Sequence, residues 1–283
     1  MERPTARRLP DGRLFLSHGP IDLLIGASGE DVAVACAYTA ATARFETILG
    51  ELVAELPALR SVGAPVSGIT AQRMAAAVAP HQRRTFVTPM AAVAGAVADE
   101  VLDYTVAAAP LSRAIVNNGG DIALHLARAA TATARIALAD GRSAGRITLA
   151  ADDGVGGIAT SGRHGRSLSL GIADSVTVLA ASAAQADAAA TLIANAVDLP
   201  GHPSVVRVAA ETLDPDTDLS GRAVTTDVGP LADDEIGAAL GAGRAAAQRM
   251  AEAGLIHAAA LFLRGQSITV GANTLRLKEI SAP

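Results

Sequence analysis

The chain has no tryptophan and very few other aromatic side chains. Its 283 residues include two tyrosines and four phenylalanines, whereas hydrophobic residues of all kinds make up 50% of the sequence. Proteins that bind single-stranded nucleic acid use aromatic rings on which bases stack, so this function is disfavoured. The core must be built from small aliphatic side chains, which let helices and sheets approach closely.

The sequence also lacks an excess of positive charge. It contains 23 Lys and Arg against 28 Asp and Glu, for a formal net charge of −5. Nonspecific binding to nucleic acid needs a surplus of cationic side chains against the phosphates. We therefore expect no nucleic-acid partner.

Cysteine is nearly absent as well. Cys36 is the single cysteine, so no disulfide can form within the chain. The six histidines form no His-Glu-x-x-His motif, and one cysteine cannot build a Cys-x-x-Cys site. A structural or catalytic zinc site is therefore disfavoured.

No apolar run approaches the ~20 residues that a membrane-spanning helix needs. Residues 1–16 carry arginines at positions 3, 7, 8 and 13 with no apolar stretch behind them, which is not typical of a secretory signal. We expect a soluble, cytoplasmic protein without a membrane partner.

The pattern of apolar residues predicts helices and short strands in alternating groups. Helices are expected over residues 31–56 with Ser28 as cap, 70–78, 89–105, 182–197 with Ser182 as cap, 204–212 and 233–253. Strands are expected over 13–17, 21–25, 157–160, 175–179, 256–263 and 267–270, and an antiparallel meander over 113–116, 121–126, 135–139 and 146–149, with Asp140-Gly141 as one of its turns.

This order of elements predicts an α+β fold, with antiparallel sheets packed against long Ala-rich helices. No linker divides the chain, so residues 1–283 are expected to form a single domain or two packed halves that meet near residue 110. Exposed sheet edges tend to need cover, and we therefore expect a homodimer.

The first candidate site is a polar glycine turn between two strands, formed by Asn117, Asn118, Gly119, Gly120 and Asp121. Consecutive glycines let the backbone approach a ligand and present its N–H groups. The alternative interpretation is an ordinary tight hairpin turn.

The second candidate is a strand end formed by Thr160, Ser161, Gly162 and Arg163. Hydroxyl groups, free N–H groups and a guanidinium together can hold a phosphate. The alternative is a strand end followed by a polar loop.

The third candidate is a pair of oxygen-bearing side chains, Asp187 and Thr191. Residues four apart lie above one another on one face of a helix. A carboxylate and a hydroxyl placed in this way can bind Mg²⁺, which prefers oxygen ligands and often accompanies phosphates. The alternative is a carboxylate near a helix N-terminus and an ordinary helical threonine.

In this order the motifs resemble those of the ApbE-type flavin transferases, and residues 89–95 are similar to an uncharacterised ApbE-like branch of that superfamily. The matching segments are Asn118-Gly119-Gly120-Asp121, Ala159-Thr160-Ser161-Gly162, Ser175-Val176-Thr177-Val178, and Ala186-Asp187 with Thr191.

The resemblance implies a T-fold-like α+β architecture that binds FAD in a cleft. It implies Mg²⁺ on Asp187 and Thr191, and contacts to the flavin or its diphosphate from residues 117–121 and 160–163. It also implies transfer of FMN from FAD to a Thr or Ser of an acceptor protein.

The sequence departs from the transferase pattern between residues 163 and 174. Transferases carry a His-x-x-Asp-Pro-x-Thr-Gly segment there, which this chain lacks. Asp174 lies where the missing aspartate would be, so it is the candidate general base or replacement metal ligand, and a turn aspartate is the alternative. Three functions stay open: a flavin transferase, a flavin or nucleotide carrier without turnover, and an enzyme for another small anion.

Overall fold

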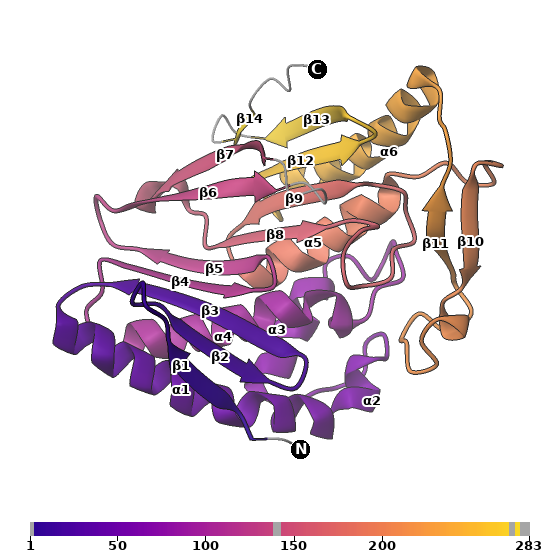
Figure 1. Cartoon of the computed structure of the whole chain (residues 1–283). Coiled ribbons are helices and arrows are strands. Elements are labelled where there is room, and N and C mark those ends of the chain that lie inside the picture. The colour runs from indigo at the N-terminus through magenta and orange to yellow at the C-terminus, as the bar shows by residue number, and fades with distance from the viewer. Residues whose placement is uncertain (1–2, 138–142, 272–274, 278–283) are drawn as a thin grey trace. The chain divides into compact units, whose positions relative to one another are not determined.

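The computed structural model describes residues 3–137, 143–271 and 275–277 (Figure 1). The chain divides into two compact units. The first unit comprises Met1–Ala132, Ala150–Ala159 and Ala180–Ala188, and the second comprises Thr133–Leu149, Thr160–Leu179 and Ala189–Pro283. The division falls inside five elements: β6 (Thr131–Ala137), β7 (Ser143–Ala150), β8 (Gly157–Ser161), β9 (Ser175–Ala180) and α5 (Ala183–Ala196).

The first unit is built around an antiparallel sheet. Its strands follow the chain in order: β1 (Thr5–Arg8), β2 (Leu14–His18), β3 (Ile21–Ser28), β4 (Arg113–Asn118) and β5 (Asp121–Leu126). The start of β8 then pairs with β5, with Ile158 opposite Ile122. The strands predicted over residues 13–17 and 21–25 are confirmed by β2 and β3, which pair as a hairpin.

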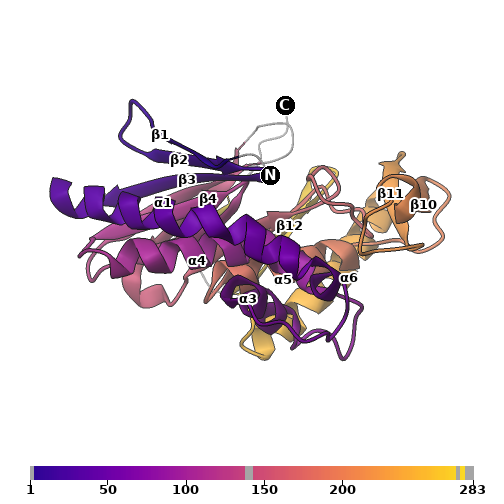
Figure 2. The same cartoon turned by 90° about the horizontal axis from the view of Figure 1, so that it is seen from below.

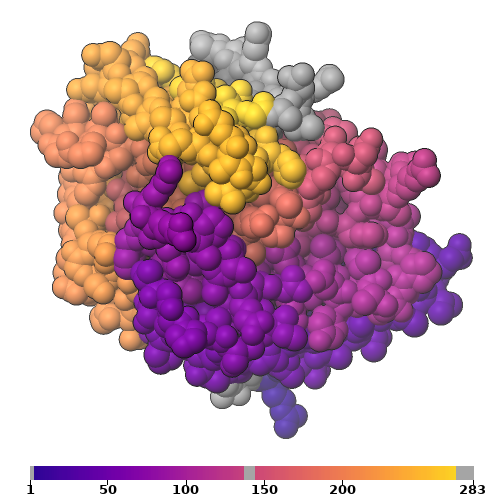
Figure 3. Space-filling model, turned by 180° about the vertical axis from the view of Figure 1, so that it is seen from behind, coloured from indigo at the N-terminus to yellow at the C-terminus, as the bar shows by residue number. Residues whose placement is uncertain are grey.

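Two helices, α1 (Asp31–Ala54) and α4 (Val93–Ala107), pack on one face of this sheet. The other helical segments, α2 (Leu56–Leu59), α3 (Ile69–Val78) and the 3₁₀ turn Pro89–Ala92, pack on these helices and on one another. Figure 2 shows α1 and α4 on the same side of β1 to β4. The purple atoms of the helical segment form a continuous surface in Figure 3. Beneath the surface of the protein, the side chains of Phe45 and Ile48 of α1 are fully buried, as the spacing of apolar residues along α1 predicts.

The second unit contains one run of paired strands and two small sheets. In the run, β12 (Ala258–Leu263) pairs antiparallel with both β9 and β13 (Gln266–Gly271), and α6 (Asp233–Glu252) packs on β12 and β13. In the first small sheet, β10 (Val205–Ala209) pairs with β11 (Ala223–Val228). In the other, β7 (Ser143–Ala150) lies between β14 (Leu275–Leu277) and β6 (Thr131–Ala137).

These sheets and helices confirm the predicted α+β fold class. Most predicted helices are also confirmed, and Ser182 does cap α5, because its Oγ accepts a hydrogen bond from the Gln185 N–H at 3.3 Å. None of the helices in the described ranges is long and apolar enough to cross a membrane.

Three predictions about secondary structure are wrong. Residues 204–212 form strand β10 and a 3₁₀ turn instead of a helix, because Val205, Val206 and Val208 are β-branched and find a partner in β11. Ser28 does not cap α1: it ends β3, and the cap position is Glu30. The expected meander divides, since β5 pairs with β4 and β8 while β6 and β7 lie in another sheet. The expected turn at 140–141 lies outside the described residues.

Candidate functional site

The glycine turn joins β4 to β5 in the first unit. Gly119 and Gly120 have φ angles of 65° and 117°, which glycine adopts without strain. The backbone N–H of Gly120 donates to Asn117 Oδ1 at 2.8 Å, so the Asn117 side chain stabilises the turn. Asn118 and Asp121 face each other across the hairpin. The turn is a tight hairpin, as the simpler interpretation holds, and it also places two polar side chains next to each other.

Asn118 connects this turn to the start of α4. Its side-chain amide is 4% exposed, and Nδ2 donates to the carbonyl oxygen of Ala94 at 3.0 Å. Neighbouring residues of a strand point to opposite faces of the sheet. Asn118 therefore lies on the face covered by α4, and Asn117 lies on the other face.

Asp187 of α5 contacts the same part of α4. Its Oδ2 accepts a hydrogen bond from the Gly95 N–H at 3.0 Å. Burial raises the pKa of Asp187 well above its ordinary value, and the neighbouring negative charge of Asp121 raises it further. Hydrogen bonds from the Gly95 and Ala94 N–H groups act in the opposite direction. The first unit thus brings Asn118, Asp121 and Asp187 together around the first turn of α4.

A further carboxylate in this region, Asp99, was missed by sequence reasoning. It is 7% exposed, and its two oxygens accept hydrogen bonds from the backbone N–H groups of Ala183 at 2.9 Å and Ala184 at 2.8 Å. These are the first N–H groups of α5, where a helix favours negative charge. Burial raises the pKa of Asp99 to about 6, although both hydrogen bonds lower it. The only feature of the sequence that could have indicated Asp99 is its position as an acidic residue within the Ala- and Val-rich segment of α4.

Two glycines let α4 and the sheet approach α5 this closely. A Cβ at Gly95 would overlap the carbonyl of Ala183, and a Cβ at Gly157 would overlap the backbone of Ser182 and Ala183. The overlapping atoms belong to the backbone and cannot rotate away. The sequence needs glycine at both positions for these elements to pack.

Thr191 follows Asp187 by one turn of α5, and both side chains are half-buried. Asp187 and Thr191 therefore lie four residues apart on a helix, as predicted. Among the described residues, no three or more His, Cys, Asp or Glu side chains gather at metal-binding spacing. The metal-binding role of Asp187 and Thr191 stays a prediction.

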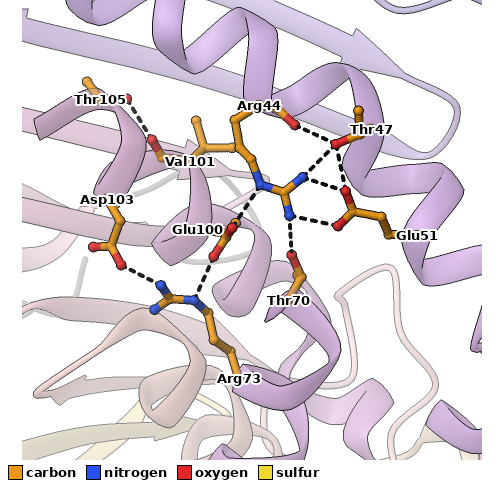
Figure 4. A network of polar contacts seen from close by, with 9 residues as sticks. All are labelled: Arg44, Thr47, Glu51, Thr70, Arg73, Glu100, Val101, Asp103 and Thr105. Carbon is orange, nitrogen blue, oxygen red and sulfur yellow. Dashed lines mark hydrogen bonds and ion pairs between the residues drawn. The ribbon is translucent and has the colours of Figure 1, made fainter. Parts of the chain in front are cut away.

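A buried network of charges holds α4 in place against α1 and α3 (Figure 4). Glu100 is 1% exposed and accepts hydrogen bonds from Arg44 Nε and Arg73 Nε, each at 2.8 Å. Arg44 also pairs with Glu51 at 2.7 Å, and Arg73 pairs with the exposed Asp103. Because α4 carries Gly95 and Asp99, this network fixes the helix on which the site depends.

The Thr-Ser-Gly-Arg strand end lies in the second unit. The hydroxyl groups of Thr160 and Thr177 are 2.9 Å apart and share a hydrogen bond. A Cβ at Gly162 would overlap the carbonyl of Asp174, so only glycine fits there. Arg163 donates from its backbone N–H to the carbonyl of Ala173 at 2.9 Å.

Asp174 has both carboxylate oxygens engaged. Its Oδ1 accepts from Arg163 Nε at 3.0 Å and Nη2 at 2.9 Å, and its Oδ2 accepts from the backbone N–H of Arg264 at 2.6 Å. Arg264 has a φ of 48°, unusual for a residue other than glycine, and its guanidinium also contacts the carbonyls of Val228 and Gly229. Asp174 therefore joins a strand end to a turn.

Ser175, directly after Asp174, is another residue, like Asp99, to which the sequence analysis gave no role. Its side chain is 4% exposed, and its hydroxyl has no hydrogen-bond partner among the residues that the structure describes. A buried hydroxyl without a partner lowers the stability of the fold.

Comparison with known proteins gives one family and several relatives. The family model described as AbpE bacteria matches residues 6–269. The UPF0280 protein of Methanopyrus kandleri is 35% identical over 175 residues, which cover 62% of this chain and 69% of that protein. The UPF0280 protein of Methanothermobacter thermautotrophicus is 40% identical over 136 residues, which cover 47% of this chain and 51% of that protein, so the match spans about half of its length.

Solved structures of flavin transferases are similar over most of the chain at low identity. The apo form of the Pseudomonas stutzeri flavinyl transferase ApbE has a TM-score of 0.43 at 14% identity, covering 97% of this chain and 96% of that chain. The flavin transferase ApbE from Vibrio cholerae has a TM-score of 0.44 at 13% identity, covering 95% and 98%.

Proposed function

The chain belongs to the AbpE bacteria family, and from this premise we propose that it binds a flavin nucleotide, FAD, together with Mg²⁺. The proposed contacts in the first unit are the polar cluster of Asn118, Asp121 and Asp187, with the backbone of Gly119 and Gly120 beside it.

The effect of the Asp121 charge on Asp187 is the observation that carries this proposal. Burial and the charge of Asp121 both make the ionised form of Asp187 unfavourable. A divalent cation removes this cost, since it compensates both carboxylates. Mg²⁺ is commonly held by one or two carboxylates, with water and substrate phosphates as its other ligands, so the side chains present fit this ion.

Thr191 is the proposed second Mg²⁺ ligand on α5, one turn from Asp187. When bound, the ion would neutralise charge on the diphosphate of the nucleotide. Asn118 has its amide nitrogen committed to Ala94, and its Oδ1 is the atom that we propose for the flavin contact.

In the second unit, we propose that Thr160, Ser161, Gly162 and Arg163 bind a phosphate group. The partnerless hydroxyl of Ser175 supports a polar ligand at this strand end. For Asp174, its bonds to Arg163 and to the Arg264 N–H favour a positioning role over that of a general base, because a base needs an oxygen that is not already committed.

Flavin transfer to an acceptor protein and flavin carriage without turnover are the two forms of this proposal. The absence of the His/Asp-Pro segment between residues 163 and 174 favours the carrier. The order of the glycine turn, the strand end and the Asp187–Thr191 helix, which resembles that of the transferases, favours the transferase. Either form is proposed as a homodimer, which light scattering of the purified protein would measure.

One experiment separates these outcomes. The purified protein is mixed with FAD, with and without Mg²⁺, and followed by flavin absorbance and by chromatography of the products. With a Ser/Thr peptide added as acceptor, AMP released only with Mg²⁺, while FMN passes to a peptide hydroxyl or to water, indicates an enzyme, and a saturable change in the flavin spectrum without products indicates a carrier. The absence of both would overturn the proposal. Asp187→Asn should lose the Mg²⁺ effect, whereas Asp152→Asn, at an exposed position, should retain it.

A further inference from the structure

A pocket of about 590 Å³ opens on the first unit, and its floor is one face of β3 and β4. Leu24 and Gly26 of β3 pair with Asn117 and Ile115 of β4, and all four line the pocket. The alternate residues on these strands point to the opposite face, and Ile25 and Val116, for example, are fully buried there. The pocket therefore lies across the sheet from Asn118 and α4.

The opening is created where β2 and β3 separate. Their pairing ends with Leu14 opposite Ile25, and the Tyr38 hydroxyl occupies the gap beyond it. This hydroxyl accepts a hydrogen bond from the Ala27 N–H at 3.2 Å and lies 3.2 Å from the carbonyl oxygen of Gly12. Because the tyrosine satisfies the backbone groups that the strands leave unpaired, the gap is a stable part of the fold.

Guanidinium groups surround this floor. Arg8 lies over the Tyr38 ring at 5.0 Å from its centroid, Arg113 Nη2 donates to Ser28 Oγ at 3.2 Å, and Arg13 pairs with Asp11 at 2.6 Å.

The lining carries a surplus of positive charge. Its only acids are Asp11 and Asp31, so its three arginines exceed its acids by one. The side chain of Arg113 is held by a neutral hydroxyl, which leaves its positive charge uncompensated by that contact.

We propose that this pocket binds a small molecule with a flat apolar body and a single carboxylate or phosphate group. Leu24 and Ile115 supply apolar contact, and Gly26 leaves the floor open, because only the flexible Arg13 side chain comes within 4 Å of a Cβ placed there. A guanidinium presents paired N–H groups that match the oxygens of a carboxylate or a phosphate. The volume lies within the ordinary range for ligand sites.

This pocket is separate from the proposed flavin site, since Asn117 and Asn118 point to opposite faces of the sheet. A binding experiment without FAD and without Mg²⁺ therefore tests the pocket alone. The aromatic sulfonate 8-anilinonaphthalene-1-sulfonate serves as the fluorescent probe, titrated against the full chain. Phenyl phosphate and benzoate are then added separately as competitors, to distinguish the two anionic groups.

We expect saturable binding of the probe at one site and displacement by one of the two competitors. Arg113→Ala should weaken binding about tenfold, because it removes a charge-assisted contact. Ile115→Glu should abolish binding by placing a carboxylate on the floor. Arg83→Ala, at an exposed position outside the pocket, is the matched control and should bind as the wild type does.

Circular dichroism confirms that each variant is folded before it is titrated. The proposal is overturned if neither competitor displaces the probe, or if Arg113→Ala and Arg83→Ala bind it equally well.

Discussion

Asp99 of α4 and Asp187 of α5 each accept backbone hydrogen bonds from the first turn of the other's helix. Asp99 binds the N–H groups of Ala183 and Ala184, and Asp187 binds the N–H of Gly95. The two helices thus cap each other at their N-termini, where backbone donors would otherwise lack partners. This exchange holds the Asp187 carboxylate at the candidate site. It requires the N-termini of α4 and α5 to lie close together.

The raised pKa of Asp99 predicts a dependence of stability on pH. The folded-state pKa is about 6 against an ordinary 3.8, so the folded state holds the proton more tightly than the unfolded state. The contribution of Asp99 is therefore most favourable below about pH 4, declines as the pH rises to about 6, and then stays constant. The decline is on the order of 2–3 kcal/mol.

Asp99→Asn removes the titrating group. It also removes one of the two carboxylate oxygens that accept hydrogen bonds from the Ala183 and Ala184 N–H groups. We expect the variant to be less stable than the wild type at pH 4, with the difference narrowing toward pH 7. Urea unfolding of both proteins at pH 4, 5, 6 and 7 measures it. A difference that stays constant across this range would show that Asp99 does not titrate as described.

The close packing at Gly95 predicts opposite effects for two glycine substitutions. Gly95→Ala places a methyl group against the Ala183 carbonyl and should destabilise the protein by about 1–3 kcal/mol or more. Gly237→Ala, in α6 where nothing lies within 4 Å of a Cβ, should stabilise it by about 0.5–1 kcal/mol. Thermal unfolding compares the two, and a Gly95→Ala protein as stable as Gly237→Ala would contradict the packing.

The buried network around Glu100 predicts a large cost for removing its charge. Glu100→Gln leaves Arg44, which is 7% exposed, with one carboxylate fewer, and the expected loss is about 3 kcal/mol. Asp103→Asn breaks the Arg73 pair at a side chain that is 60% exposed, and the expected loss is below about 1 kcal/mol. Equal losses in urea unfolding would mean that burial does not set the strength of this network.

Mg²⁺ binding at Asp187 should depend on pH, because the carboxylate must lose its proton before it coordinates the ion. Since the pKa of Asp187 is raised, the apparent affinity should increase with pH beyond the range in which an ordinary aspartate titrates. Mg²⁺ titrations in the presence of FAD at pH 5, 6, 7 and 8 measure this trend. An affinity that is the same at all four pH values argues against Asp187 as the ligand.

Elements that depend on neighbouring residues were predicted correctly from the sequence. Elements whose structure depends on pairing with a distant segment were not. The hairpin of β2 and β3 follows from alternating apolar residues with a His-Gly-Pro turn, and α5 follows from Ala-rich spacing with Ser182 as cap. The strand β10 was mistaken for a helix because its partner β11 lies beyond an intervening loop.

The candidate site was predicted in part for the same reason. Asn118, Asp121 and Asp187 could be found because their motifs are short and resemble those of a known family. Asp99 could not, since its partners are backbone groups of α5, which lies 84 residues further along the chain. The contacts of Asp174 with Arg163 and Arg264 are likewise tertiary, and they are the reason for the positioning role proposed for it.

Isothermal titration calorimetry of FAD into wild type, Asp187→Asn and the control Asp152→Asn, with and without Mg²⁺ in one buffer, measures whether Asp187 couples the metal to FAD binding. We expect saturable binding by the wild type and by Asp152→Asn, strengthened by Mg²⁺, and loss of that strengthening in Asp187→Asn. Binding that is absent in the wild type, or equally strengthened by Mg²⁺ in Asp187→Asn, would contradict this expectation.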